Sequence, residues 1–225
     1  HSPNGMFTFP ERHDKMCSYL YFSFLRGQTM DSNFFALISR MRYIARWGLM
    51  RNALPENIQE HSHMVAVLAH ALGVIRRDIF HQPCDVNALA TAALYHDASE
   101  ILTGDLPTPI KYHNAEIMSA YHAVEDLAVQ KLLGMLPPEL RETYADVLAE
   151  DKDGDIYPLV KAADKLSAYI KCIEERKAGN NEFLSAEAQT HAALEGSPLP
   201  EVQYFLEHFI PAFERDLDEL GAIGQ

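Results

Sequence analysis

Cysteines, basic residues and long apolar runs are all scarce in this chain, and each scarcity excludes a class of protein. The 225 residues include three cysteines, Cys17, Cys84 and Cys172, which are odd in number and widely spaced. They form neither a CxxC metal motif nor a disulfide framework, so a reducing cytoplasm is the expected location. No apolar run reaches the roughly 18 residues of a membrane-spanning helix, so we expect no association with a membrane.

The scarcity of basic residues bears on the partners of the protein. Lysine and arginine together number 19 against 32 acidic residues, which gives a formal net charge of −13 at pH 7. A protein that coats nucleic acid needs a basic stripe, so we expect no nucleic-acid partner. A small phosphorylated substrate stays possible, because a bound metal ion and one or two arginines dominate the field inside a pocket.

The composition is that of one globular domain preceded by a segment of different character. With 48% hydrophobic residues, the chain has enough apolar side chains for one well-buried core. We expect this domain to cover residues 30–225. Residues 1–29 lack the charged start, long apolar core and cleavage site of a secretory signal. We interpret them as a leader of uncertain origin: an expression remnant, an overextended start or an added helix.

Apolar residues recur at three- and four-residue steps through almost all of the domain, which predicts an all-α, single-domain helical bundle. The expected helices, by approximate residue numbers, are 34–47, 57–79, 85–97, 114–133, a short one after 138, 159–178, 182–195 and 199–219. Asn57 or Glu60 begins the second helix, Asp85 is the expected N-cap of the third, and Gly179 follows the end of the long one. Prolines and a glycine make residues 103–109 a loop, and the acidic run 150–155 is expected to be another.

Four ionisable residues stand inside these apolar helical stretches. His61 begins an apolar stripe, the adjacent pair His96-Asp97 lies in the next helix, and Asp164 lies in the long helix. Bare ionisable groups in a core are costly unless they are paired or bound to a metal. Two imidazoles and two carboxylates converging from three helices would make a mixed nitrogen and oxygen site for a divalent cation.

Glu100 extends this pattern. It stands four residues after His96 and three after Asp97, so on a continuous helix it points into the same cavity. A carboxylate that is not needed as a ligand suits proton transfer to or from a metal-bound water.

Each of these residues also has an ordinary structural explanation. A lone histidine on an apolar helix face, such as His61, is usually a hydrogen-bonded core residue, and adjacent His-Asp pairs occur by chance. Asp164 could pair with Lys161 or Lys165 on its own helix. The joint order, the helical setting and Glu100 favour the metal site.

The order H…HD…D resembles the signature of the HD-domain metal-dependent phosphohydrolases. Within that superfamily, residues 30–220 are similar to the bacterial 5′-deoxynucleotidases. The segments that carry this resemblance are Arg46-Trp47, Leu49-Met50-Arg51-Asn52, Glu60-His61-Ser62, Tyr95-His96-Asp97-Ala98-Ser99-Glu100, Thr103-Gly104-Asp105-Leu106-Pro107-Thr108-Pro109, Lys161-Ala162-Ala163-Asp164 and Gly179-Asn180-Asn181-Glu182-Phe183. The loop at 103–109 is far more specific than the four ligands, which many activities share.

The resemblance implies a mononuclear site with His61, His96, Asp97 and Asp164 as ligands and Glu100 as a catalytic carboxylate. It favours Co²⁺ or Mn²⁺, and the donor set also suits Zn²⁺, Ni²⁺ or Fe²⁺. It further implies a homodimer.

The resemblance also implies a substrate site around Arg46, which would orient the 5′-phosphate through its guanidinium fork. Trp47 would crowd out a ribose 2′-hydroxyl, and Asp105 would accept from the 3′-hydroxyl or assist proton transfer, so Arg46 and Asp105 join Glu100 as catalytic residues. The expected contacts with the nucleotide are Arg46, Trp47, His61, Asp97, Asp105, Leu106, Pro107 and Thr108.

The residues outside the metal set have structural alternatives too. Trp47 could be core packing, because it is the one tryptophan in the chain. Arg46 could be a cation at a helix C-terminus, and Asp105 could be an N-cap or turn residue.

The implied reaction is the metal-dependent hydrolysis of deoxyribonucleoside 5′-monophosphates, with loose base preference and selection against ribonucleotides. One alternative is another HD phosphohydrolase that acts on nucleotide triphosphates or cyclic nucleotides, which the loop at 103–109 and Arg46-Trp47 disfavour. The other is a sensor that binds metal and nucleotide without turnover, which the presence of both Glu100 and Asp105 disfavours.

Overall fold

The computed structural model describes residues 32–111, 113–149 and 154–221. Within these ranges every regular element is helical, and one isolated bridge joins Ala45 to Asn57. The all-α prediction is therefore confirmed for the described part of the chain. The predicted leader at 1–29, Cys17 and most of the acidic run at 150–155 lie outside the described residues.

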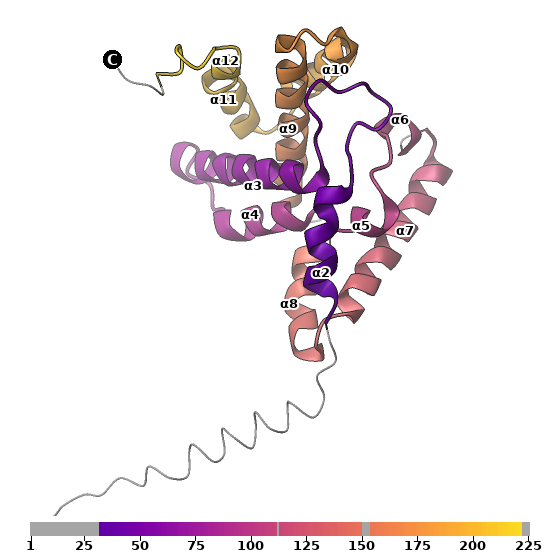
Figure 1. The fold of residues 1–225 in the computed structure, drawn as a ribbon. Helices are drawn as coiled ribbons and strands as arrows, with labels where there is room; N and C mark the ends of the chain where they lie inside the picture. Colours follow the sequence, from indigo (N-terminus) through magenta and orange to yellow (C-terminus); the bar gives the residue numbers. More distant parts are fainter. Residues whose placement is uncertain (1–31, 112, 150–153, 222–225) are drawn as a thin grey trace, which may run out of the picture. The chain divides into compact units, whose positions relative to one another are not determined.

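The main core lies between three helices (Figure 1). Helix α3 (Ile58–Val74) runs beside α4 (Val86–Tyr95), and the long helix α9 (Tyr157–Lys177) packs against α3. Their apolar faces meet in a cluster that also receives α11 (Pro200–His208). Its fully buried members include Val65, Leu72, Leu89, Leu159, Leu166, Ile173 and Val202. Burial of each such side chain stabilises the fold by about 1.5–3 kcal/mol, and this holds the three helices together.

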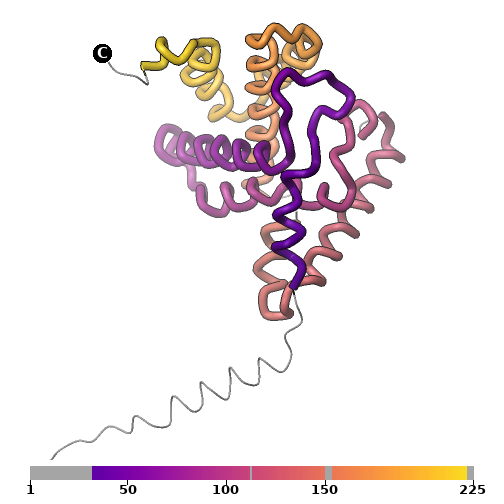
Figure 2. Tube along the Cα trace, viewed as in Figure 1, coloured from indigo at the N-terminus to yellow at the C-terminus, as the bar shows by residue number. Residues whose placement is uncertain are grey.

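A second, smaller cluster lies where α2 (Phe34–Ile38), α7 (Ala115–Gly134) and α8 (Pro138–Leu148) meet. Phe34, Leu132 and Leu136 are almost completely buried there. Figure 2 shows α7 and α8, in pink and orange-pink, folded back on each other beside the indigo α2. The remaining elements are η1 (Ser39–Tyr43), η2 (Ile75–Ile79), α5 (Glu100–Thr103), α6 (Thr108–Lys111), η3 (Asn181–Phe183), α10 (Leu184–Glu195) and α12 (Ile210–Phe213).

The polar residues expected at helix ends perform that role. The Asn57 side chain accepts from the backbone N–H groups of the second and third residues of α3, and Asp85 does the same for α4. These bonds satisfy two of the four N–H groups that each helix start leaves unpaired. Gly179 follows α9 with a φ of 82°, the left-handed conformation that glycine adopts without strain.

Some predicted helix boundaries are wrong. The first helix ends at Tyr43, four residues before Trp47, because the chain turns back and pairs Ala45 with Asn57. The last predicted helix, 199–219, is broken at Phe209, where Pro211 follows and lacks a backbone N–H. The loop at 103–109 is confirmed from Gly104 to Pro107, because Thr103 ends the short helix α5 and Thr108 opens the short helix α6.

The prediction that one helix carries His96, Asp97 and Glu100 is also wrong. Helix α4 ends at Tyr95, and Glu100 begins the separate short helix α5. The turn between them uses backbone bonds of three-residue span, such as Glu100 N to Asp97 O at 3.0 Å. This tighter turn sets the directions of Asp97 and Glu100, so helical spacing does not describe them.

Among the described residues, no helix combines the length and apolar character that crossing a membrane requires.

Candidate metal centre

Three of the predicted ligands converge from different elements. His61 comes from the first turn of α3, His96 from the end of α4 and Asp164 from the first half of α9. Each offers one ligand atom, and these atoms all lie within 4.8 Å of one another. His61 Nε2 is 3.0 Å from Asp164 Oδ1, and the two imidazole rings have centroids 5.3 Å apart.

Asp97, the fourth predicted ligand, faces the same point. Its Oδ2 lies 3.1 Å from His96 Nε2 and 3.6 Å from His61 Nε2. Four ligands at about 2.1 Å from a tetrahedral cation would stand about 3.4 Å from one another. The observed separations therefore bracket the spacing of a metal-coordination shell.

The two imidazoles are held with the same nitrogen inward. His96 donates Nδ1–H to the Ala93 carbonyl at 2.8 Å, and His61 Nδ1 bonds to Ser167 Oγ at 3.2 Å. Both Nε2 atoms are buried and lack a hydrogen-bond partner of acceptable geometry. Since a buried polar atom without a partner is costly, these atoms fit a bound cation that their lone pairs would coordinate. The four predicted ligands therefore suit a divalent metal ion.

The two carboxylates of the set are ionised. Burial alone would raise the pKa of Asp97, but His96, His61 and the Arg46 guanidinium hold it far below its ordinary value. Burial likewise opposes ionisation of Asp164, and the same two histidines hold its pKa low. Both groups are therefore anionic near neutral pH, the state that ligates a cation.

Glu100 has the opposite electrostatic character. It is 6% exposed, and its Oε2 atom is buried without a hydrogen-bond partner. Burial, and then the nearby charges of Asp97 and Asp105, raise the pKa of Glu100 far above its ordinary value. A carboxyl group that holds its proton at neutral pH beside a cation site is suited to proton transfer.

Arg46 joins the ligand set to the loop that precedes α3. Its Nη1 lies 3.4 Å from Asp97 Oδ2, and its Nε donates to Glu56 Oε2 at 3.1 Å. Because the preceding helix ends at Tyr43, the alternative of a helix-terminal cation is wrong. Burial would lower the pKa of Arg46, but the surrounding carboxylates raise it, and Asp97 contributes most among them. A fixed positive charge therefore stands beside the predicted ligands.

Trp47 stands in an unusual backbone conformation. Its φ is 59°, in the left-handed region that bulky residues rarely adopt. Its indole Nε1–H donates to Glu56 Oε2 at 3.0 Å, and the ring packs on the buried Phe183 with centroids 5.2 Å apart. The residue is only half-buried, so core packing does not account for it fully.

The loop at 103–109 brings Asp105 to the same place. The Asp105 carboxylate accepts from the Trp47 backbone N–H and lies close enough to Arg46 for their charges to interact. Burial raises the pKa of Asp105 above its ordinary value. Leu106 and Pro107 are half-buried and Thr108 is exposed, and their predicted contacts with a nucleotide stay predictions.

Two residues of the site escaped the sequence analysis. Glu56 follows Pro55 in a loop, where no periodicity signals a role, yet it binds both Arg46 and Trp47. Ser167 stands three residues after Asp164 on α9, a spacing that places it on the same helix face. It orients His61, a role that its small side chain alone does not indicate.

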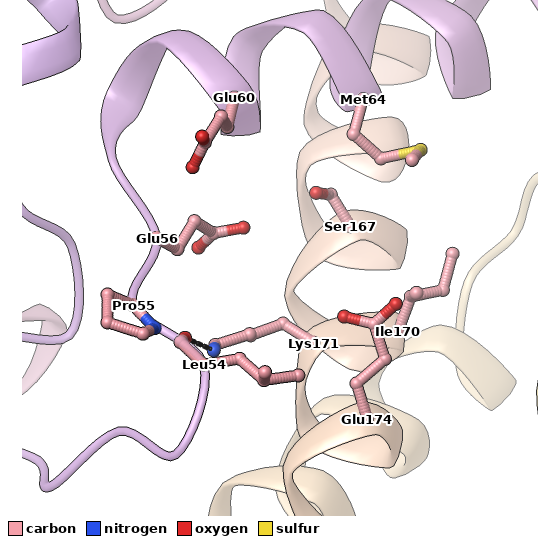
Figure 3. Close-up of a pocket in the computed structure, with 9 residues that line it drawn as sticks. All are labelled: Leu54, Pro55, Glu56, Glu60, Met64, Ser167, Ile170, Lys171 and Glu174. Atoms are coloured by element: carbon pink, nitrogen blue, oxygen red, sulfur yellow. Dashed lines mark hydrogen bonds between the residues drawn. The ribbon is translucent and has the colours of Figure 1, made fainter.

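A cavity of about 200 Å³ adjoins the site between the 54–60 segment and α9 (Figure 3). Its wall includes Glu56, which binds Arg46 and Trp47, and Ser167, which binds His61. Glu60 and Glu174 add two more carboxylates, and the one lysine in the wall, Lys171, is already paired with Glu175, so the lining disfavours a phosphate. The anionic part of a substrate is therefore expected on the Arg46 side of the ligands.

Comparison with known proteins places these residues in a family. A model described as 5′-deoxynucleotidase YfbR-like matches residues 33–213. A Shigella boydii protein named 5′-deoxynucleotidase YfbR is 50% identical over 192 residues, which cover 85% of this chain and 96% of that protein.

Solved structures share the fold. An HD-domain phosphohydrolase from Listeria innocua superposes with a TM-score of 0.72 at 26% identity, covering 80% of this chain and 88% of that one. An HD phosphohydrolase from cyanophage S-2L, bound to dA and one catalytic Zn²⁺ ion, superposes with a TM-score of 0.52 at 26% identity, covering 82% and 96%.

Proposed function

The chain belongs to the YfbR-like 5′-deoxynucleotidase family, and from this we propose how its residues divide the work of the reaction. The protein is a hydrolase of deoxyribonucleoside 5′-monophosphates, which it converts to deoxynucleoside and phosphate. The observation that carries the proposal is the pair of buried, inward-facing Nε2 atoms on His61 and His96, set against the ionised Asp164.

The metal would be held by His61, His96, Asp97 and Asp164. When bound, a divalent cation lowers the pKa of a coordinated water and neutralises charge on the phosphoryl oxygens. The Zn²⁺ of the cyanophage enzyme supports a divalent ion at such a site. For this chain we favour Co²⁺ or Mn²⁺, with Zn²⁺, Ni²⁺ and Fe²⁺ as alternatives, because the His₂Asp₂ set does not select strongly among them.

Arg46 would bind the 5′-phosphate. Its guanidinium stands beside Asp97, so a phosphate that reaches the ligands also reaches this charge. The fork geometry would orient the phosphoryl group so that water attacks phosphorus opposite the departing 5′-oxygen, and its charge would counter the negative charge that grows on the phosphoryl oxygens.

Glu100 would handle the proton. Its raised pKa keeps it protonated, so it can donate to the departing 5′-oxygen, directly or through water. The reverse assignment, in which Glu100 accepts the proton of the attacking water, requires its ionised form, which a bound cation nearby would favour. Asp105, next to the Trp47 backbone, is proposed to accept from the 3′-hydroxyl or to assist this transfer.

Trp47 would select the sugar. Its ring stands between Glu56 and Phe183, and a bulky group at this point would collide with a 2′-hydroxyl. We propose that Leu106, Pro107 and Thr108 also contact the nucleotide, along with the ligands His61 and Asp97. Since these contacts concern phosphate and sugar, we expect loose base preference. We further propose a cytoplasmic homodimer.

The function is tested by removing metal with a chelator and measuring phosphate release from dAMP and AMP after Co²⁺ or Mn²⁺ is restored. We expect metal-dependent release from dAMP and almost none from AMP. Release only from a triphosphate or a cyclic nucleotide would assign the chain to another substrate class. Stable binding of dAMP without release from any nucleotide would favour a sensor.

A further inference from the structure

Arg46 and Trp47 lie in residues 44–57, a segment without helix or strand that closes on itself. Arg46 N donates to Glu56 O and Ile58 N donates to Ile44 O, both at 3.0 Å. This pairing brings Glu56, which follows nine residues after Trp47, back beside the start of the segment. The path of the backbone thus places the Glu56 carboxylate beside Arg46 and Trp47, the two residues proposed to bind phosphate and sugar.

A single oxygen of Glu56 serves both of them. Its Oε2 accepts from Arg46 Nε at 3.1 Å and from Trp47 Nε1 at 3.0 Å. The Glu56 side chain is 16% exposed and that of Arg46 is 12% exposed, so water competes weakly for these bonds. Hydrogen bonds to an ionised acceptor are roughly twice as strong as neutral ones. The carboxylate therefore ties the two side chains to each other.

The backbone of Trp47 shows why such a tie is needed. A bulky residue at a φ of 59° persists only when surrounding contacts determine its conformation. Three bonds hold the backbone: Met50 N donates to Trp47 O at 2.8 Å, Asn52 Nδ2 donates to the same oxygen at 3.5 Å, and Trp47 N–H donates to Asp105. None of them fixes the direction of the ring. An indole has one N–H donor, and Glu56 accepts it.

We propose that Glu56 is the positioning residue that sets sugar selection, by locking the Trp47 indole against the phosphate-binding Arg46. The inference rests on the proposed function and adds the residue that enforces its selection against ribonucleotides. Without Glu56, Arg46 keeps its contact with Asp97, whereas the Trp47 indole loses the acceptor of its N–H and keeps its packing on Phe183, so the ring can rotate. A ring that rotates no longer excludes a 2′-hydroxyl.

The test compares Glu56→Leu and Glu56→Gln with Glu60→Leu and Glu60→Gln. Glu60 lines the same cavity, as Figure 3 shows, and it is exposed, so its variants remove the same charge from the same region. No hydrogen bond to Arg46 or Trp47 is formed by Glu60 in the described part of the chain. Glu56→Leu abolishes both bonds, and Glu56→Gln leaves a neutral oxygen that can accept them weakly.

Two readouts are taken for each variant. The first is the ratio of kcat/KM for dAMP to that for AMP. The second is the fluorescence of Trp47, the single tryptophan in the chain, including its quenching by acrylamide. Metal content and melting temperature are measured alongside.

Glu56→Leu is expected to lower the dAMP to AMP ratio about ten-fold or more, the effect of losing a hydrogen bond to a charged group. It is also expected to shift the emission and raise the quenching, with metal content unchanged. Glu56→Gln is expected to fall between Glu56→Leu and the parent, and both Glu60 variants to match the parent. An unchanged ratio with unchanged emission would overturn the inference, even if stability fell. If Glu56→Leu does not fold, Glu56→Gln decides by the same readouts.

The two claims fail in different ways. A parent protein that releases no phosphate from dAMP overturns the proposed function. In that case, the fluorescence of the four variants still decides whether Glu56 holds the Trp47 ring. A parent that hydrolyses dAMP, with a Glu56→Leu variant of parental ratio and emission, overturns only the inference.

Discussion

The ligand cluster (His61, His96, Asp97 and Asp164) and the 44–57 loop adjoin each other, but different forces hold them in place. His61 and Asp164 lie on α3 and α9, and His96 and Asp97 directly follow α4, so the packing of these three helices into the core places all four. The loop is held instead by polar contacts from the far half of α9. Glu175, fully buried, accepts from Ala53 N at 2.8 Å and Leu54 N at 3.0 Å.

Lys171 completes this polar clamp. It donates to Glu175 at 2.5 Å and to the Leu54 carbonyl, and the latter bond is drawn in Figure 3. The Asn180 side chain donates to Glu175 and to the Arg51 carbonyl, both at 2.7 Å. The proposed metal ligands are therefore held by helix packing, which many residues share, whereas the residues proposed to select the substrate are held by a few hydrogen bonds.

The largest effect is expected from a break in the ligand cluster. His96→Ala removes one buried Nε2 donor and leaves three ligands, so we expect loss of metal and of detectable activity. Metal analysis after gel filtration and phosphate release from dAMP measure this. Full activity with full metal content would contradict the assignment of His96 as a ligand.

The next effect separates catalysis from metal binding within the cluster. Glu100→Gln is expected to lower kcat by about 10²–10⁴-fold, the usual contribution of general acid–base catalysis, with metal content intact. If metal is lost together with activity, Glu100 is a ligand or a folding residue.

The raised pKa of Glu100 also predicts a stability effect in the metal-free protein. An acid whose folded pKa is raised stabilises the fold fully below its unfolded value, near 4.5, and loses that contribution as pH rises. Metal-free Glu100→Gln is therefore expected to melt above the parent at pH 8, with a smaller difference at pH 5. An equal difference at both values would contradict the burial of this charge.

A break in the polar clamp should affect the loop without affecting the metal. Glu175→Gln leaves Lys171 buried without its counter-charge, which costs about 3 kcal/mol in the free energy of unfolding. Urea denaturation measures this, and we expect KM for dAMP to rise while metal content stays constant. Leu184→Ala, at an exposed apolar position on α10, serves as a control of small effect.

The clamp also has a pH signature. Burial opposes ionisation of Glu175, but Lys171 and Asn180 lower its pKa to about 2 from 4.5. A lowered pKa stabilises the fold above the unfolded value, and this contribution is lost as pH falls from about 4.5 to about 2. The stability difference between parent and Glu175→Gln should therefore shrink over that interval.

The smallest effect is expected from Trp47→Ala. The change removes the proposed barrier to a 2′-hydroxyl altogether, so we expect the dAMP to AMP ratio of kcat/KM to fall at least as far as in Glu56→Leu, about ten-fold or more. Metal content and dAMP turnover should change less. A parental ratio in this variant would show that selection against ribonucleotides lies elsewhere.

The contrast between helix packing and the hydrogen bonds of the loop also explains which features the sequence predicts. The sequence predicts that His61, His96 and Asp164 lie together, because ionisable residues stand out in apolar helical stretches, and it predicts the caps Asn57 and Asp85, because caps have a local signature. It also places Glu100 near them, but it does not predict the turn after Tyr95, since helical periodicity cannot report a change of helix type.

The contacts of the 44–57 loop were beyond reach for a different reason. Glu56 binds residues nine and ten positions away, and Glu175 binds the loop from more than 120 positions away. Such pairings follow from the path of the chain, and no spacing in the sequence encodes them. The φ of Trp47 belongs to the same group, because nothing in an Arg-Trp-Gly string marks a left-handed aromatic residue.

The hydrogen bonds that orient the two imidazoles differ in their sensitivity to substitution. His61 is oriented by the side chain of Ser167, which a single substitution could remove. His96 is oriented by the carbonyl of Ala93, and a carbonyl is present whatever side chain occupies that position. The orientation of His96 is therefore insensitive to the side chain at position 93, because it depends on a backbone carbonyl. The orientation of His61 depends on the identity of the side chain at position 167. A saturation library at positions 93 and 167 should therefore lose activity at 93 only through crowding of the core, and at 167 whenever the hydroxyl is lost.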